Sequence, residues 1–198
     1  LYYDFNPNNR LRANSIFINN TTQSLQEYKG YIRDLAEESH LEGFIRRGTY
    51  EKNQVFVNQL LGDHKLNDTS EFHWGVSYNT VKQDMPDRLQ NTMRLDKNTG
   101  QYTLASQDAS LSNRYFQNLN ENEISANLEY NFVLGGDLKD YKTRISIGYQ
   151  GRHKERDFEA NQFNLKLTRS GVQVDPNNID AIFNQSNFGI DRLFTIET

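Results

Sequence analysis

The sequence predicts an all-β chain, an antiparallel up-and-down meander that supplies about six strands of a larger transmembrane β-barrel. The first observation behind this prediction is that several segments alternate apolar and polar residues with a period of two, as a strand with two unlike faces does. The second is that short and long links alternate between these segments. Membrane barrels sort their connections in this way, with short turns at one end and long loops at the other.

The clearest of these strands is EISANLEYNFVL, residues 123–134. Its even-numbered residues from Ile124 to Leu134 are apolar, whereas the odd-numbered residues from Glu123 to Asn131 are polar. We expect the apolar face to meet lipid and the polar face to meet a wet or plug-filled lumen. The alternation keeps charges out of the lipid, where a basic residue at mid-bilayer costs roughly 2–4 kcal/mol.

Five other segments are strand-like, and they cover residues 1–5, 10–19, 52–66, 71–80 and 143–152. Many of their apolar positions are aromatic, which suits the aromatic girdles that membrane barrels place where lipid meets water. The residues predicted to face lipid are Phe72, Trp74, Val76, Tyr78, Ile124, Leu128, Tyr130, Phe132, Ile145, Ile147 and Tyr149.

The lengths of the links between the strands predict the topology of the sheet. Short links at 6–10, 67–70 and 135–141 are rich in Asn, Asp, Gly or Pro, as tight turns require. Long links cover 20–51 and 81–118. Because each strand reverses direction, all short turns should gather at one end of the sheet and all long loops at the other. A soluble β-sandwich is the alternative, since its strands also alternate, although structureless loops of about thirty residues are uncommon in compact domains.

Three local structures are predicted within the links. Residues 24–38 begin with Ser24 and Glu27 at the spacing of a capping box, which predicts a short helix. Residues 175–183 offer Asp175 as an N-cap and predict a second helix. Residues 94–106 predict a small hairpin with NTG as its turn.

Two pairings across strands are also predicted. Gly62 should lie opposite or near Trp74, because an aromatic ring that covers a glycine on the neighbouring strand is a common device in sheets. This register keeps Asp63 off the apolar face. On the polar face, opposite charges should lie across two strands, with the acidic pair opposite or diagonal to the basic pair. The residues of these two pairs are Glu121, Glu123, Arg152 and Lys154.

Three stretches resemble a known family over nearly the whole chain. They are GYIRDLAEESHLEGFIRRGTYEKNQVFVNQLLGDHKLND at 30–68, WGVSYNTVKQDMPDRLQNTMRLD at 74–96 and IGYQGRHKERDFEANQFN at 147–164. They closely resemble the barrel domain of Bacteroidetes-type TonB-dependent outer-membrane receptors. The resemblance implies a barrel of about 22 strands that is plugged by an N-terminal domain. It also implies import of a scarce nutrient, driven by energy that TonB passes from the inner membrane.

We therefore expect residues 1–198 to be one partial transmembrane β-barrel domain in the cell outer membrane, with the plug and the remaining strands outside this chain. The partners implied are membrane lipid, the rest of its own barrel and plug, TonB through a region N-terminal to the chain, and a surface lipoprotein. The net charge of −4 gives no reason to expect a nucleic acid.

The sequence gives no sign of an enzyme, a cofactor or a metal site. Cysteine is absent, which excludes thiol catalysis, disulfides and cysteine-based zinc sites. The four histidines, His40, His64, His73 and His153, have no metal-ligand spacing. The DKNTGQY segment at 96–102 begins like a calcium loop, but its glycine is one position early and no glutamate follows at position twelve.

Two groups of arginine and aromatic residues in the predicted extracellular loops are candidate ligand contacts, because such groups bind carboxylates, phosphates or sugars. They are Arg46, Arg47, Arg114, Tyr115 and Phe116. Loop packing and surface charge are the alternative roles.

The leading functional hypothesis is a segment of an active importer that takes a siderophore, glycan, peptide or vitamin into the periplasm. Two alternatives stay open: a non-transporting outer-membrane adhesin or scaffold, and a soluble all-β carbohydrate-binding module.

Overall fold

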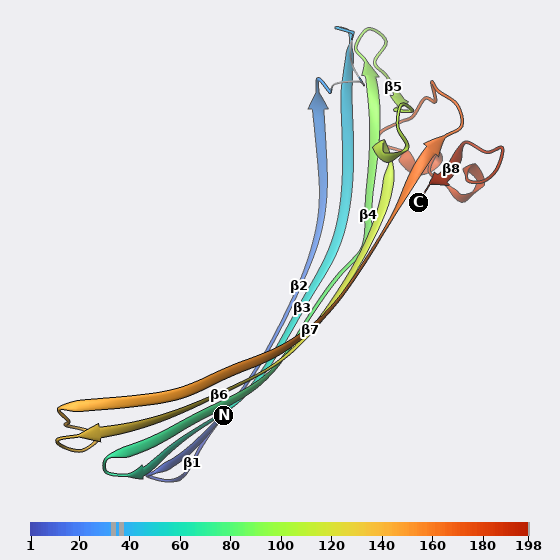
Figure 1. Cartoon of the computed structure of the whole chain (residues 1–198). Helices are drawn as coiled ribbons and strands as arrows, with labels where there is room; N and C mark the ends of the chain where they lie inside the picture. The colour runs from blue at the N-terminus through green and yellow to red at the C-terminus, as the bar shows by residue number, and fades with distance from the viewer. Residues whose placement is uncertain (33–34, 36–37, 198) are drawn as a thin grey trace. The chain divides into compact units, whose positions relative to one another are not determined.

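The computed structural model describes residues 1–32, 35 and 38–197, and the strands among them form a single open sheet. The strands lie in the order β1-β2-β3-β4-β6-β7-β8, with β5 paired to β4 (Figure 1). They are β1 (Tyr2–Asn6), β2 (Asn9–Gly30), β3 (Leu41–Asn67), β4 (Ser70–Asp96), β5 (Gln101–Leu104), β6 (Asn113–Leu134), β7 (Thr143–Leu167) and β8 (Phe194–Glu197). The predicted all-β, antiparallel up-and-down meander is confirmed.

Five strands are much longer than predicted. β2 and β6 have 22 residues, β7 has 25, and β3 and β4 have 27 each. The prediction of long loops at 20–51 and 81–118 is therefore wrong over most of its length, and the sheet has eight strands. In segments such as 21–24, TTQS, both faces of the strand are polar, so hydropathy shows no period of two although the backbone is still extended.

The predicted helices do not form as predicted. Residues 24–30 belong to β2, where the strand ladder competes successfully with the capping box, and part of the remaining prediction lies outside the described residues. Within 175–183 there is only one 3₁₀ turn, η2 (Ile179–Ala181). Two further 3₁₀ turns are η1 (Ala109–Leu111) and η3 (Gln185–Asn187). No helix in the described residues has the length and apolar character to cross a membrane.

The hairpin predicted at 94–106 is confirmed. The end of β4 pairs with β5 in a register that places Met93 opposite Leu104 and Asp96 opposite Gln101. Gly100 closes the turn with φ 69°, a left-handed conformation that glycine adopts without a steric penalty. Asp96 Oδ1 accepts the backbone N–H of Asn98 at 2.9 Å, and this hydrogen bond lowers the pKa of the Asp96 carboxyl group.

The described residues fall into two compact units. Unit 1 contains residues 1–20, 53–83 and 119–158, and unit 2 contains residues 21–52, 84–118 and 159–198. Each long strand contributes residues to both units, and each unit is described by itself below.

The three short turns lie next to one another in unit 1. Lys65 N donates to Asn8 O at 2.7 Å, which joins the first turn to the end of β3. Leu138 N donates to Asp68 O at 2.9 Å, which joins the second turn to the third. The prediction that the short turns gather at one end of the sheet is therefore confirmed.

The register of β3 and β4 in unit 1 also agrees with prediction. A Cβ atom at Gly62 would overlap Nε1 of Trp74, so the indole ring covers this glycine. Trp74 Nε1 also donates to His64 Nε2 at 2.9 Å. Asp63 contacts His73 at 2.7 Å, on the opposite face from Trp74. Trp74 and His73 therefore lie on opposite faces, as the alternation of side chains along a strand requires.

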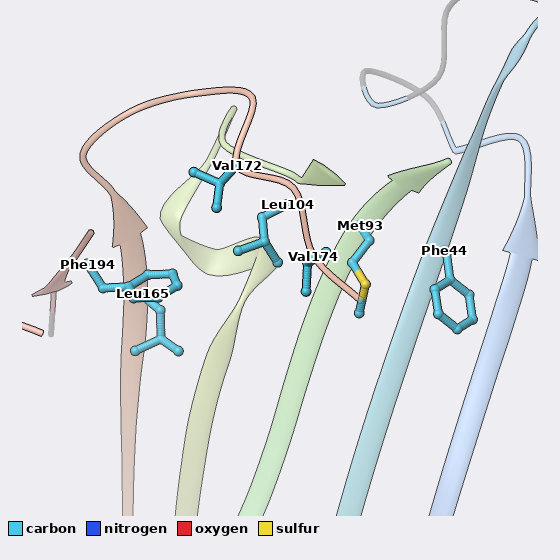
Figure 2. Packing of buried hydrophobic residues seen from close by; sticks show 7 residues of the cluster. All are labelled: Phe44, Met93, Leu104, Leu165, Val172, Val174 and Phe194. Atoms are coloured by element: carbon cyan, nitrogen blue, oxygen red, sulfur yellow. The ribbon is translucent and has the colours of Figure 1, made fainter. Parts of the chain in front are cut away.

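A hydrophobic cluster in unit 2 is built from strand ends and from the segment that follows β7. Its seven buried members are Phe44, Met93, Leu104, Leu165, Val172, Val174 and Phe194 (Figure 2). Backbone hydrogen bonds fix the segment, since Leu104 N donates to Val172 O at 2.9 Å and Val174 N donates to Tyr102 O at 3.0 Å. Residues 172–174 thus pair with β5 much as a further strand would.

The alternation along β4 is interrupted in unit 2. Asp84 accepts a hydrogen bond from Asn118, and Asp87 accepts two from Arg114. Asn118 and Arg114 are both even-numbered residues of β6 and so share a face, whereas Asp84 and Asp87 differ in parity. An extra residue must lie between these two aspartates, where Pro86 provides no N–H for the ladder.

We predict that Gly62→Ala lowers the free energy of unfolding by about 1–3 kcal/mol, because the new methyl group displaces Trp74 and breaks its hydrogen bond to His64. Gly48→Ala, also in β3, is the control because a methyl group at that position would meet no neighbouring atom within 4 Å. Urea unfolding followed by Trp74 fluorescence measures both. Equal effects of the two substitutions would show that the Trp74 ring does not constrain position 62.

The turn between β6 and β7 gives a prediction for pH dependence. Asp137 Oδ1 accepts the backbone N–H of Lys139 at 2.8 Å and of Asp140 at 3.0 Å, and these bonds lower the pKa of Asp137. A lowered pKa in the folded state stabilises the protein above the unfolded value of 3.8, and this contribution is lost as pH falls through the folded pKa. Asp137→Ala should therefore destabilise at pH 7, and its difference from wild type should shrink below pH 3.8. Urea unfolding across this pH range is the measurement, and a difference independent of pH would contradict the prediction.

Candidate functional site

One face of unit 1 is apolar and exposed. Eight of the residues predicted to face lipid are exposed: Val76, Tyr78, Ile124, Leu128, Tyr130, Ile145, Ile147 and Tyr149. Ile147 and Tyr149 reach 70% exposure each. Phe72, Trp74 and Phe132 are half-buried, and Phe72 and Trp74 each stack with His64. The same face of β2 and β3 carries Phe17 and Phe56, whose rings meet edge to face.

The other face of unit 1 carries a chain of polar and charged side chains across neighbouring strands. Arg12 contacts Asp63 at 2.9 Å, and Asp63 contacts His73 at 2.7 Å. His73 in turn lies 3.4 Å from Glu71, and Glu71 accepts from Arg144 at 2.9 Å. The chain of contacts thus connects residues of β2, β3, β4 and β7.

β6 joins this polar network through Asn131, which is fully buried. Its amide nitrogen donates to Glu71 at 3.3 Å and to Glu129 at 3.0 Å, and its amide oxygen accepts from Ser146 at 2.6 Å. The amide therefore uses both its donor and its acceptor groups, as a buried polar side chain requires. Asn131 and Glu129 lie on the polar face, as the sequence predicted.

A second charged group on the polar face centres on Glu121. Glu121 contacts Lys154 Nζ at 2.7 Å and Arg156 Nε at 2.7 Å, and Glu123 contacts Lys154 at 3.2 Å. The prediction of charge pairing between β6 and β7 is correct for Lys154. It is wrong in naming Arg152, because Arg156 forms the second ion pair with Glu121. Alternation alone identifies the face of β7 but leaves the register along the strand open.

In unit 2, Arg46 lies beside a pocket of about 630 Å³. Its Nε donates to Glu27 at 2.8 Å, and its Nη1 donates to the carbonyl of Pro176. Phe44 and Tyr102, whose ring centroids are 5.5 Å apart, also line the pocket. Arg46 is thus an internal partner of the fold, since its donors are used by Glu27 and by the segment after β7.

Arg114 also has an internal role. Its Nε and Nη2 donate to the two carboxylate oxygens of Asp87 at 2.9 Å each, and this bidentate bond raises the pKa of Arg114. Its guanidinium carbon lies 5.8 Å from the centroid of Phe116, which packs edge to face against Phe163. Arg114 and Phe116 therefore link neighbouring strands of unit 2 on one face of the sheet.

Arg47 and Tyr115 lie on the opposite face from these residues, because they alternate with Arg46 and with Arg114 and Phe116. Arg47 donates to Gln90 Oε1 from Nε at 3.0 Å and from Nη2 at 2.5 Å. The ring of Tyr115 is covered by Arg88, whose guanidinium carbon lies 4.2 Å from the ring centroid. The five predicted ligand contacts are thus divided between two faces and do not form one site.

Arg88 was not among the residues predicted from sequence to contact a ligand, although it packs against Tyr115, which was. Arg88 lies within PDRLQN, residues 86–91, which was predicted to be loop and has no aromatic neighbour in sequence. Tyr115 reaches it from β6. Burial lowers the pKa of Arg88, and the nearby charge of Arg47 lowers it further.

Comparison with known proteins leaves the chain unplaced: no protein-family model matches it, and no curated protein matches its sequence.

We predict that Arg156→Gln destabilises the protein and that Arg152→Gln, four positions away on the same face, does so much less. Glu121 pairs with Arg156. A double-mutant cycle with Glu121→Gln tests this pair. The sum of the losses of unfolding free energy in Arg156→Gln and in Glu121→Gln should exceed the loss in the double variant. Urea midpoints measure the cycle. Additive effects at Glu121 and Arg156 would show that the pair does not contribute to stability.

Proposed function

We propose that the chain is part of the wall of a transmembrane β-barrel in a bacterial outer membrane, within a TonB-dependent receptor that imports a nutrient ligand. The observation that carries the membrane part of this proposal is the contrast between the two faces of unit 1. One face exposes aliphatic and aromatic side chains, and the other holds the linked polar and charged side chains of Arg12, Asp63, His73, Glu71 and Arg144.

The contrast matches the solvents on the two sides of a barrel wall. An exposed apolar face of this extent is unfavourable in water, and it is satisfied by lipid. The charged groups on the other face would be unfavourable in lipid, and a wet or plug-filled lumen accommodates them. Each of β3, β4, β6 and β7 also contributes more residues to unit 1 than the roughly 9–11 that a tilted strand needs to cross the membrane.

The edge of the sheet supports the proposal that further strands complete the barrel. β1 pairs with β2 from Asn9 to Arg12, and Leu1 exchanges two backbone hydrogen bonds with Ala13. Beyond Ala13 this edge of β2 has no strand partner among the described residues. Lipid cannot hydrogen-bond free backbone groups, and a closed barrel satisfies them. In this proposal the remaining strands and the plug come from the rest of the same protein.

The import function rests on the resemblance of 30–68, 74–96 and 147–164 to Bacteroidetes-type TonB-dependent receptors. In this mechanism the plug and the extracellular loops capture the ligand, and TonB moves the plug. This chain would supply wall and loops and no chemical catalysis, and a surface lipoprotein would be a further partner. The competing function is a non-transporting adhesin or scaffold. Binding of the periplasmic domain of TonB by the full-length protein distinguishes the two.

The membrane assignment is tested with spin labels on two exposed residues of β7, Ile147→Cys and Gln150→Cys, which the alternation places on opposite faces. The chain has no cysteine of its own to label. The labels are measured in the full-length protein in lipid vesicles. Oxygen concentrates in lipid, so it should speed the electron-spin relaxation of the label at 147 more than that of the label at 150. The label at 150 should be the less accessible of the two to oxygen.

A water-soluble nickel complex provides the matched measurement at the same two positions. We expect it to reach the label at 147 poorly. Equal access of the nickel complex to both labels, together with a full-length protein that stays soluble without detergent, would overturn the membrane assignment and favour a soluble carbohydrate-binding module.

A further inference from the structure

We propose that Arg47 and Arg88, with the ring of Tyr115 behind Arg88, form a binding site for an oxyanion, a carboxylate or phosphate group of a small molecule. The three residues come from β3, β4 and β6 and lie within unit 2. If the protein is an importer, this anion is part of the imported ligand, and that role alone rests on the proposed function. The site itself rests on the contacts of the described residues.

Arg88 is held in place without an ion pair to a carboxylate among the described residues. Its guanidinium carbon lies 4.2 Å from the centroid of Tyr115, a stacking contact that orients the plane of the group. Its Nε atom is buried and has no hydrogen-bond partner among the residues that the structure describes. A buried donor of this kind costs free energy unless a partner binds it. A ligand oxygen would supply that partner.

Arg47 is the second cation of the site, and its protein partner is neutral. Two of its nitrogens donate to one oxygen of Gln90, an amide that leaves the positive charge uncompensated. Gln90 lies two residues from Arg88 in β4 and therefore on the same face, so its bonds to Arg47 place Arg47 on the face that carries Arg88. The charge of Arg47 also lowers the pKa of Arg88. Two guanidinium groups thus interact unfavourably with each other until an anion joins them.

Several other arginines of the chain are paired with a carboxylate, a partner that Arg47 and Arg88 lack among the described residues. Six of them have a carboxylate partner, in the pairs Arg10–Asp4, Arg12–Asp63, Arg46–Glu27, Arg114–Asp87, Arg144–Glu71 and Arg156–Glu121. Within the described residues, Arg47 and Arg88 have no ion pair, and neither do Arg94, Arg152, Arg169 and Arg192. Arg152, Arg169 and Arg192 are exposed to solvent, whereas Arg47 and Arg88 are half-buried. Asp87, the neighbour of Arg88 in sequence, binds Arg114 on the other face.

The chemistry of two guanidinium groups selects the ligand class. Each group presents a planar fork of N–H donors that matches the oxygens of a carboxylate or phosphate. A neutral sugar could accept these hydrogen bonds but would leave the two like charges unbalanced. An oxyanion both accepts the bonds and cancels the repulsion, so an anionic ligand is favoured over a neutral one.

The test is equilibrium dialysis of the full-length protein in detergent against radiolabelled citrate and, separately, radiolabelled inorganic phosphate. Sodium chloride at about 0.15 M screens weak surface binding. We expect saturable binding of at least one probe, and the probe that binds identifies a carboxylate or a phosphate site. Arg47→Gln and Arg88→Gln should each weaken it about tenfold or more, as the loss of a charged hydrogen bond does.

Arg114→Gln is the matched control, because it removes an arginine of the opposite face and should leave binding unchanged. If Arg88→Gln fails to fold, Arg88→Lys replaces it in the test. The lysine keeps the charge and loses the planar fork, so this variant should bind the probe more weakly than wild type. Absence of saturable binding of both probes, or unchanged binding in the Arg47→Gln/Arg88→Gln double variant, would overturn the proposal. The assay uses no lipid vesicle and no TonB, so its failure is separate from failure of the membrane assignment.

Discussion

The alternation of side chains along hydrogen-bonded strands is the constraint on which the other features of this protein depend. An extended backbone places successive side chains on opposite faces, and the ladder to neighbouring strands holds them there. In unit 1, Trp74 therefore covers Gly62 on one face while its neighbour His73 bonds Asp63 on the other. Adjacent residues meet unlike surroundings, and a single sheet can present an apolar surface and a charged one.

Unit 2 shows how an open sheet obtains a core without a second sheet. The segment after β7 folds back so that Val172 and Val174 join Leu104 and Met93 in a buried cluster (Figure 2). Phe194 of β8 stacks on Phe183 and Phe188 in the same region. The segment that links β7 to β8 thus provides apolar burial that strands of this unit do not provide among themselves.

The strand core of unit 1 could be predicted from sequence because its two faces differ in polarity. The stretch from Glu123 to Leu134 shows the period of two directly, and the turns at 67–70 and 135–141 carry Asn, Asp and Gly. The length of the strands could not be predicted, because in TTQS at 21–24 both faces are polar. The capping-box pattern at Ser24 and Glu27 was misleading, since Glu27 instead binds Arg46 across two strands.

The candidate site was only partly predictable for a related reason. Arg47 and Tyr115 could be named from sequence, but Arg88 could not, because its aromatic partner is on another strand. The extra residue between Asp84 and Asp87 also breaks the parity of β4, so counting from Trp74 gives the wrong face beyond it. The residues on each face of this region become clear only from contacts across strands.

The neighbouring pair Arg46 and Arg47 has a consequence for how this chain can vary in evolution. Arg46 binds Glu27 on one face of the sheet, and Arg47 binds Gln90 on the opposite face. Deleting one residue from the adjoining part of β3 would move Arg46 and Arg47 to each other's faces. It would also reverse the face of every other residue between the deletion and the next bulge. Within the strands, length variation should therefore persist only where a compensating bulge restores the parity.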